Sequence, residues 1–393
     1  MRPIPYGKQF VDDSDIRSVV DVLSSDWLTQ GPNVCDFERA LCQKFESECA
    51  TVLSSGTASL HLAGLALGWK AGDVVLTTPI TFLASANCIL YAGAKADFVD
   101  IDACSYTIDV EKLETKLKQY DACGNRVKAV VAVDYAGQPC QWESLRRLAN
   151  KYEFQLVDDG CHAIGAKYKT VPIGSSKYAD ATVFSFHPVK HITTGEGGAV
   201  LTDSRELDEK IKMLRMHGIT KDKSLLDRND GPWYYEMHEL GFNYRITDIQ
   251  CALGLSQLKK LDRFIKRRRQ IAAYYDGIFG EDERFIIPQT TPETEHVYHL
   301  YPLQIKFDDI SVAKDVFFQH LGERKIFCQV HYIPVHLQPY YRRRFGFKEG
   351  DFPVSEEFYK REVSIPIYPA LENTEMEYVG AEIVESIVEH CLT

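Results

Sequence analysis

The residues best suited to chemistry lie around Lys190, in residues 184–190 (FSFHPVK) and in the glycine-rich turn that follows, residues 195–198 (GEGG). A lysine just past the end of a strand can bind a carbonyl compound as a Schiff base. The hydroxyl of Ser185 and the glycine turn add donors for a phosphate. Taken alone, the segment also fits a surface lysine in a flexible loop, so other segments must decide between the two interpretations.

Two adjacent acids, Asp158 and Asp159, close a strand-like run that begins near Phe154. Pyridoxal phosphate (PLP) acts as an electron sink only while its pyridine nitrogen is protonated, and a buried carboxylate beside that nitrogen favours the protonated form. Asp159 is therefore a candidate partner for a pyridine nitrogen. A helix cap or a metal ligand is the alternative interpretation of such a pair.

A third segment, residues 54–58 (SSGTA), leads from a strand through a glycine turn into a helix. Exposed amides and the positive end of the helix dipole make such a turn an anion site, which suits a cofactor phosphate. A plain helix N-cap has the same pattern. Residues 79–82 (PITF) close the next strand and place Phe82 where a pyridine ring could stack.

These segments lie at strand ends in a predicted α/β domain. From about residue 50 to 202, short apolar runs alternate with helix-length amphipathic stretches, the pattern of a mostly parallel sheet covered on both faces. The predicted strands are residues 50–54, 73–78, 96–100, 127–133, 154–158, 181–186 and 199–202. Because ligands bind outside the carboxyl ends of parallel strands, we expect the chemistry there.

The length of the chain predicts two domains, since 393 residues are too many for one compact core. We expect a large domain over residues 1–250 and a smaller C-terminal α/β domain over residues 251–393. Apolar residues recur at three-to-four spacing near residues 246–279, which predicts a long helix that links the two domains.

Composition narrows the classes of function. With 45% hydrophobic and 26% charged residues, the chain is typical of soluble globular proteins, and no apolar run is long enough to span a bilayer. The amino terminus lacks a secretory signal pattern, so we expect a cytoplasmic protein. A formal charge of -11 argues against nucleic acid and anionic membranes as partners. The eleven cysteines include no Cys-x-x-Cys pair, and no metal site is predicted.

The order and spacing of these motifs resemble the DegT/DnrJ/EryC1/StrS sugar aminotransferases over about residues 3–370. The resemblance implies PLP fold type I, the aspartate aminotransferase-like α/β fold with a seven-stranded, mostly parallel sheet. It implies that Lys190 binds PLP covalently, that Asp159 faces the pyridine nitrogen and that His162 contacts the phenolic oxygen. The remaining cofactor contacts that it implies are Gly56, Thr57, Ala58, Phe82 and Ser185.

The same resemblance implies a homodimer. Residues 240–245 (LGFNYR) resemble the family segment whose asparagine, here Asn243, reaches the cofactor phosphate of the neighbouring subunit. Each active site would then contain residues of both chains.

Four segments resemble the family members that aminate carbon 4 of a UDP-linked 4-keto-6-deoxy-N-acetylhexosamine with L-glutamate in pseudaminic acid synthesis. They are residues 25–32, 133–137 and 329–332 and the Lys190 segment. The substrate contacts implied are Thr29, His187, Arg245, His331 and Tyr332. The diphosphate also needs cations to bind it, and Arg215, Arg245 and the cluster at residues 342–344 are candidates. For the cluster, a solvated run of surface charges is the favoured interpretation.

Several alternatives stay open. Another nucleotide 4-keto sugar could be the substrate. Sugar 3-dehydratases of the same fold replace the lysine with histidine, but His191 follows Lys190 rather than replacing it. A non-catalytic regulator would be expected to lack Asp159, Ser185 or Lys190, and a metal-dependent hydrolase would need a ligand spacing that the chain does not show. The chain departs from the family pattern at His191, where proline is common, and at residues 158–161 (DDGC), where Glu-Asp-Ala-Ala is frequent.

Overall fold

A seven-stranded sheet forms the centre of the computed structural model, which describes residues 2–388. In spatial order its strands are β2 (Cys49–Leu53), β10 (Gly198–Thr202), β9 (Ala181–Ser185), β6 (Gln155–Asp159), β5 (Ala129–Val133), β3 (Val74–Thr77) and β4 (Lys95–Phe98). Neighbouring strands are parallel except at β10, which runs antiparallel to β2 and β9. The predicted strands agree with these bounds to within two residues at each end, and the mostly parallel sheet is confirmed.

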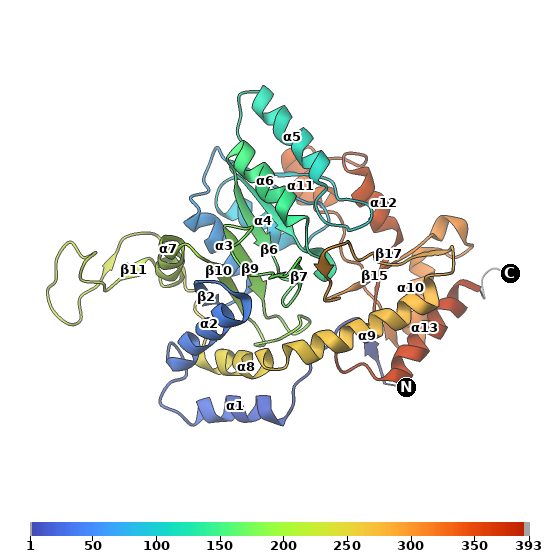
Figure 1. Cartoon of the computed structure of the whole chain (residues 1–393), viewed down its shortest axis with the longest axis horizontal. Coiled ribbons are helices and arrows are strands. Elements are labelled where there is room, and N and C mark those ends of the chain that lie inside the picture. Colours follow the sequence, from blue (N-terminus) through green and yellow to red (C-terminus); the bar gives the residue numbers. More distant parts are fainter. Residues whose placement is uncertain (1, 389–393) are drawn as a thin grey trace.

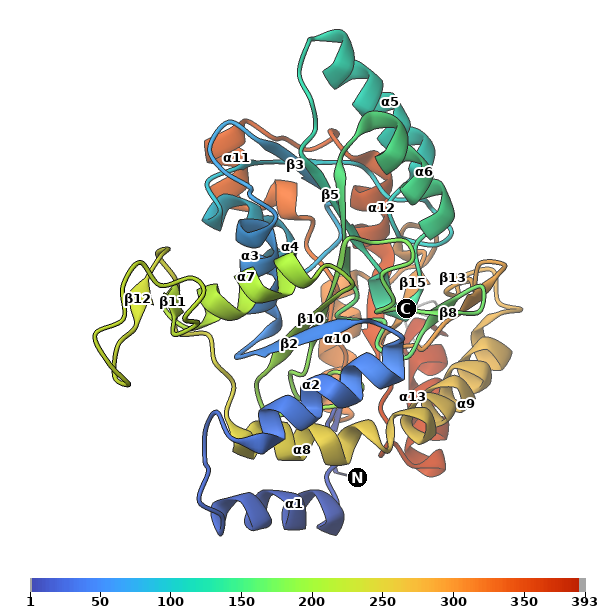
Figure 2. The same cartoon turned by 60° about the vertical axis from the view of Figure 1, so that its left-hand side comes forward.

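Helices cover both faces of this sheet (Figures 1 and 2). One face packs against α2 (Pro32–Phe45), α5 (Val110–Ala122), α6 (Trp142–Tyr152) and α8 (Asp248–Leu258), and the other against α3 (Gly56–Ala66), α4 (Leu83–Tyr91) and α7 (Arg205–Arg215). Helix α1 (Asp13–Leu23) packs on α8. Along β5, Val130 and Ala132 enter one core while Ala129 and Val131 enter the other, because successive strand residues point to opposite faces.

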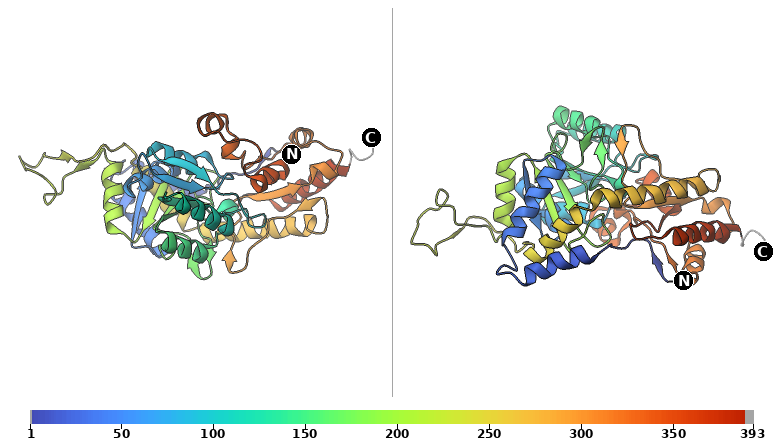
Figure 3. Two further views of the ribbon diagram at one scale, coloured as in Figure 1. Left: turned by 90° about the horizontal axis from the view of Figure 1, so that it is seen from above. Right: turned by 60° about the horizontal axis from the view of Figure 1, so that its bottom comes forward.

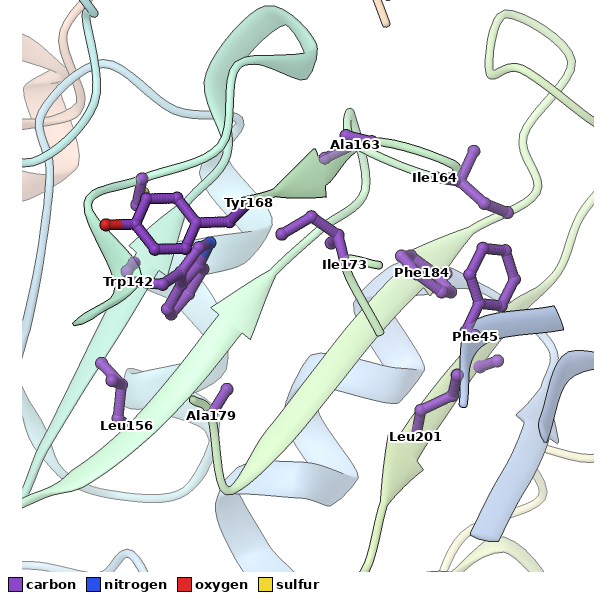
Figure 4. Packing of buried hydrophobic residues seen from close by; sticks show 14 of the residues in the cluster. Phe45, Trp142, Leu156, Ala163, Ile164, Tyr168, Ile173, Ala179, Phe184 and Leu201 are labelled. Carbon is purple, nitrogen blue, oxygen red and sulfur yellow. The ribbon is translucent and has the colours of Figure 1, made fainter. Parts of the chain in front are cut away.

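The first of these cores is rich in aromatic side chains. Figure 4 shows Phe45 of α2 beside Phe184 of β9, and Trp142 of α6 beside Tyr168. The Phe45 and Phe184 rings are tilted, with centroids 4.9 Å apart. This packing fixes β6 and β9, the two strands whose ends carry Asp159 and the Lys190 segment.

A smaller antiparallel sheet lies at the other end of the molecule (Figure 3). Its strands are β13 (Phe285–Ile286), β15 (Tyr301–Ile305) and β17 (Glu362–Ile365), with α10 (Lys314–Glu323) and α13 (Asn373–Val388) packed against them. Helices α11 (Pro339–Phe345) and α12 (Pro353–Arg361) precede β17. The amino-terminal strand β1 (Ile4–Pro5) pairs in parallel with β16 (Ile326–Phe327), so the start of the chain joins this end.

The helical tract expected near residues 246–279 consists of two helices, α8 and then α9 (Leu261–Phe279), with Lys259 and Lys260 between them. The first half of α9 packs into the core of the large sheet, and its second half packs into the core of the small one. It therefore connects the two sheets, and its expected role as the link between two domains stays a prediction. The domain boundary at residue 250 stays a prediction.

An arm extends from the end of α7 away from both sheets (Figures 1 and 2), with β11 (Ile219–Thr220) and β12 (Glu236–Met237) pairing antiparallel within it. Another short sheet joins β7 (Lys167–Tyr168), β8 (Val171–Pro172) and β14 (Thr294–Glu295). Within residues 2–388, no helix combines the length and the apolarity that crossing a bilayer requires.

Candidate active site

The segments singled out in the sequence meet around one cavity of about 680 Å³. The predicted site residues that line it are Gly56, Thr57, Phe82, Asp159, His162, Ser185, His187, Lys190, His331 and Tyr332. The first eight come from segments around the large sheet, and the last two come from the loop that follows β16. The cavity thus lies between the edge of the large sheet and this loop.

Lys190 lies in a loop that backbone hydrogen bonds hold in place. The Phe186 amide donates to the Gly197 carbonyl at 2.9 Å, the Thr194 amide donates to the Phe186 carbonyl at 3.0 Å, and the Lys190 amide donates to the His187 carbonyl at 2.8 Å. Burial lowers the pKa of Lys190, while Cys161 and Asp159 act in the opposite direction. A lysine with a lowered pKa is closer to the neutral amine that nucleophilic and base chemistry require.

Asp159 is held at the end of β6 by two donors. The Ser85 hydroxyl donates to Oδ2 at 2.5 Å, the Cys161 amide donates to Oδ1 at 3.2 Å, and Thr81 lies 2.7 Å from the Ser85 oxygen. The Asp159 carboxylate, only 6% exposed, is therefore fixed in one orientation facing the cavity.

Its neighbour Asp158 points to the opposite face of the sheet, where the Thr182 hydroxyl donates to it at 3.1 Å and burial raises its pKa well above the usual range. A loop, not a helix, follows β6, so the helix-cap interpretation of the pair is wrong. Across residues 2–388, no group of three or more histidine, cysteine or acidic side chains is placed to hold a metal ion.

The turn into α3 forms a cradle for an anion. The Ser55 side chain caps the helix by accepting from the Ala58 amide at 3.1 Å. First-turn amides have no partners within a helix, so those of Gly56 and Thr57, which line the cavity, suit a phosphate. A Cβ on Gly56 would lie 2.8 Å from the Ser185 Cβ, so only glycine lets that hydroxyl approach the turn.

Aromatic rings form the facing wall. His162 Nδ1 accepts from the Ala136 amide at 3.3 Å, so Nε2 carries the proton and donates to the Tyr332 hydroxyl at 3.1 Å. Burial, reinforced by the charge of Lys190, holds the pKa of His162 well below its usual value, so the ring is neutral. The Phe82 ring lies 6.0 Å from that of Tyr332 and is 56% exposed, which leaves it open to a planar ligand.

Other predicted residues lie outside this cavity. Thr29 forms a bridge with Thr247, and the Arg245 guanidinium donates to Asn243 at 2.9 Å on the exposed surface. Ala58 is buried, with its amide engaged by Ser55, and it does not line the cavity. The roles of these residues stay predictions.

The prediction that Arg215 is a candidate to bind the diphosphate is wrong. Arg215 is 6% exposed, and its guanidinium donates to Glu38 at 2.9 Å and to the Val52 carbonyl at 2.6 Å. It therefore holds α7 against α2 and β2, away from the cavity.

The structure adds residues to which the sequence analysis gave no role. Lining the cavity are Tyr6, Thr81, Cys161 and Glu196, and Ser85 supports Asp159. Thr81 and Ser85 had a possible signal, because hydroxyls four residues apart at a strand-to-helix junction lie on one face. Tyr6 had none, since its place depends on the pairing of β1 with β16.

These observations define a class. A type I α/β fold, a half-buried lysine of lowered pKa, a fixed carboxylate and an anion cradle in one cavity fit PLP, with the phosphate at α3 and the pyridine nitrogen toward Asp159. The chain is a PLP-dependent sugar aminotransferase. It belongs to the DegT/DnrJ/EryC1/StrS aminotransferase family, whose pattern matches residues 9–384.

Three relatives are similar to this chain over nearly their whole lengths. Uncharacterized protein MJ1066 of Methanocaldococcus jannaschii is 43% identical, covering 94% of this chain and 93% of its own. A UDP-4-amino-4,6-dideoxy-N-acetyl-beta-L-altrosamine transaminase of Campylobacter jejuni is 40% identical, covering 96% and 95%. The spore coat polysaccharide biosynthesis protein SpsC of Bacillus subtilis is 38% identical, covering 98% and 97%.

Solved structures agree with the fold. PseC of Helicobacter pylori, an aminotransferase of pseudaminic acid biosynthesis, superposes with a TM-score of 0.90 at 33% identity, covering 99% of this chain and 100% of its own. Spr1654 of Streptococcus pneumoniae, solved in a PLP form, superposes with a TM-score of 0.88 at 28% identity, covering 99% of each chain.

Proposed function

We propose that this enzyme transfers the amino group of L-glutamate to carbon 4 of a UDP-linked 4-keto-6-deoxy-N-acetylhexosamine, the type of reaction found in pseudaminic acid synthesis. The observation that carries the proposal is the 40% identity, over nearly the whole of both chains, to a transaminase named for a UDP-4-amino-4,6-dideoxy-N-acetyl sugar. The likeness to PseC supports the same substrate class.

The placement of the substrate-specific segments gives independent support. Val133, His331 and Tyr332, from two of the segments that carry the resemblance, line the cavity that contains Lys190. From the same two segments, the Tyr135 hydroxyl donates to the His331 carbonyl. These two segments are therefore in contact with each other and with the site.

Each residue has a physical role in this proposal. PLP supplies the carbonyl that accepts the amino group and a ring that spreads negative charge. Lys190 binds it and, once released, carries a proton to and from the carbon of the amino donor. Asp159 holds a proton at the pyridine nitrogen, and Phe82 stacks on the ring. His162 approaches the phenolic oxygen.

The phosphate of the cofactor is bound by Gly56, Thr57 and Ser185 of one chain and by Asn243 of a second copy, while Ala58 supports the turn through the bond from its amide to Ser55. The nucleotide sugar contacts His187, His331 and Tyr332, with Thr29 and Arg245 completing its site. Both assignments require a homodimer in which Asn243 and Lys190 of different copies share one cofactor.

A coupled assay tests the function. The enzyme is incubated with L-glutamate and a panel of UDP- and dTDP-linked 4-keto and 3-keto sugars, and 2-oxoglutarate release and the position of the new amine are measured. We expect turnover of the UDP-linked N-acetyl 4-keto sugar with amination at carbon 4, and none with a Lys190→Ala variant. Preference for a keto sugar without the acetamido group, or amination at carbon 3, would refute the proposed substrate.

A second substrate is favoured by one observation. SpsC, at 38% identity over 98% of this chain, acts in spore coat polysaccharide biosynthesis. Another nucleotide-linked 4-keto sugar, destined for a cell-surface polysaccharide, is therefore the other candidate, and the panel separates the two by which keto sugar the enzyme turns over.

A further inference from the structure

Behind His331 lies a chain of buried polar groups that belongs to β17. The His331 amide donates to Glu362 Oε2 at 2.9 Å, and His331 Nδ1 lies 2.9 Å from the Ser364 hydroxyl, which donates to Glu362 Oε1. Glu362 and Ser364 have no exposed surface. Both the backbone and the ring of His331 are thus held by the same carboxylate, once directly and once through a serine.

Two further contacts hold His331 from other directions. The Tyr135 hydroxyl of the large domain donates to the His331 carbonyl, and the Tyr6 ring lies 4.9 Å from the imidazole. Gln329 and Ser364 exchange amide hydrogen bonds of 3.1 and 2.7 Å, which join the loop to β17. The imidazole therefore has one orientation, in which Nδ1 faces Ser364 while the residue lines the cavity.

We propose that Glu362 and Ser364 are positioning residues that orient His331 and decide which of its ring nitrogens carries the proton. The inference rests on the proposed function, because it treats His331 as a contact of the nucleotide sugar.

The number of hydrogens shared by Glu362, Ser364 and His331 determines the tautomer. Ser364 has one hydroxyl hydrogen. When Glu362 is ionised it can only accept, so Ser364 donates to it, Nδ1 of His331 must donate to Ser364, and Nε2 is left with a lone pair. When Glu362 is protonated the chain can reverse: Glu362 donates to Ser364, Ser364 donates to Nδ1, and Nε2 carries the hydrogen.

The surroundings place this change near neutral pH. Burial raises the pKa of Glu362 to about 8, opposed by Ser364, by Lys314 of α10 and by the His331 amide. Burial and then the charge of Lys190 lower the pKa of His331 to about 3, so the imidazole is neutral and only its tautomer varies. Burial lowers the pKa of Lys314 to about 8, opposed by Glu362, so the charge of Lys314 changes over the same pH range as that of Glu362. The other ionisable groups near Glu362 are Tyr106, Tyr135, Tyr332 and Cys328, whose raised pKa values keep them neutral at this pH.

The tautomer matters because the nucleotide sugar presents both hydrogen-bond donors and hydrogen-bond acceptors. A lone pair on Nε2 accepts from a sugar hydroxyl or from the acetamido N–H, whereas an N–H on Nε2 donates to the keto oxygen. A site built for one arrangement leaves an unpaired polar group when offered the other, which weakens binding. The hydrogen-bonded chain Glu362–Ser364–His331, here called the relay, therefore affects the half-reaction in which the sugar is aminated.

Histidine tautomers can be observed directly in the holoenzyme labelled with ¹⁵N-histidine, with the His331 signals assigned by their loss in His331→Gln. In the wild type, the ¹⁵N shifts should move between the two tautomer patterns with a midpoint near pH 8. In Glu362→Gln the amide oxygen accepts from the His331 amide and the amide nitrogen donates to Ser364. This variant should keep the Nε2–H tautomer at every pH from 6 to 10. The matched control Glu153→Gln, at a surface pair with Arg126, should titrate as the wild type does.

Kinetics supply the second measurement, with the two half-reactions followed separately by the absorbance of the cofactor. Ser364→Ala breaks the relay and should lower kcat/KM for the UDP-4-keto sugar about tenfold, while the glutamate half-reaction changes less than twofold, as loss of one buried hydrogen bond implies. Ser386→Ala, a buried serine of α13 that donates to the Glu382 carbonyl, is the matched control.

Two results would overturn the proposal: a His331 tautomer that titrates identically in Glu362→Gln and wild type, or equal losses in both half-reactions of Ser364→Ala. If Ser364→Ala does not fold, the nearly isosteric Glu362→Gln decides alone. Because the ¹⁵N measurement needs no sugar, failure of the proposed substrate would appear as absent turnover alongside an intact tautomer titration.

Discussion

Replacing Asp159 with asparagine separates cofactor binding from catalysis. The change removes the negative charge that would keep the pyridine nitrogen protonated, but it keeps the size of the side chain. Oδ1 of the amide can still accept from Cys161, whose amide donates to Asp159 at 3.2 Å in the wild type. The variant is therefore expected to retain the local structure.

The contact between Ser85 and residue 159 survives the substitution because the Ser85 hydroxyl can rotate. In the wild type Ser85 donates to Asp159 at 2.5 Å, which leaves Thr81 as the donor across the 2.7 Å contact between the two hydroxyls. In Asp159→Asn the amide nitrogen donates to Ser85, Ser85 turns to donate to Thr81, and the Thr81 hydrogen faces the cavity that it lines. No buried polar group is left unpaired, so the structural cost should stay within about 1 kcal/mol, the net value of one hydrogen bond.

The catalytic cost should be much larger. Losing a group that controls a proton at the reacting centre lowers rates by roughly 10² to 10⁴, or about 3 to 5 kcal/mol. We therefore expect the thermal midpoint of the Asp159→Asn apoenzyme to match the wild type, PLP affinity to fall less than about tenfold, and the single-turnover rate with glutamate to fall at least about a hundredfold. Fluorescence titration with PLP and stopped-flow absorbance measure the two effects. Equal losses of affinity and rate, or an unchanged rate, would refute the assigned role of Asp159.

Three further predictions follow from the site. Borohydride reduction and peptide mapping should find the pyridoxyl group on Lys190, and label on a different lysine would contradict the assignment. Equimolar mixing of inactive Lys190→Ala and Asn243→Ala chains should restore up to roughly a quarter of wild-type activity, because half of the randomly paired dimers are mixed and one of their two sites is intact; exchange without recovery would argue against a shared site. Burial raises the pKa of Asp134 from 3.8 to about 7, so its protonation contributes stability that is full below about pH 4 and is lost as the pH rises through 7. Asp134→Asn should flatten the thermal midpoint over that range, and a slope equal to that of the wild type would count against the buried acid.

The sheet could be predicted from sequence because its strands are buried on both faces. Residues such as Val130 and Val131 must both be apolar when each enters a different core, so the strand reads as a continuous apolar run. The direction of β10 could not be predicted, since an apolar run such as GAVLT fits a parallel and an antiparallel strand equally well. The break between α8 and α9 was also hidden, because lysines 259 and 260 are good helix formers.

The candidate site residues at strand ends could be brought together from the sequence because each belongs to a local motif. Their supports could not, since they arrive from distant segments: Ser85 reaches Asp159 from α4, and Tyr6 reaches His331 from the amino terminus. Glu362 and Ser364 left a faint signal, two polar residues at alternate positions of an otherwise apolar strand, which places both on one face. Only the structure shows that this face is buried against His331.

The charges of the cavity give a physical reason for a shared site. Among residues 2–388, Lys190 is the only lysine or arginine that lines the cavity. The lining also contains the carboxylates of Asp159 and Glu196. A nucleotide sugar adds a diphosphate, and the cofactor adds a phosphate, so one chain would leave several negative charges without cations in a partly enclosed site, where such charges are costly. The resemblance assigns Asn243 to the phosphate and Arg245 to the substrate, but exposed Asn243 and half-buried Arg245 both lie outside the cavity of their own chain. Both facts have one explanation if a second copy brings these two residues to the mouth of the first, and the mixing experiment tests that arrangement through Asn243.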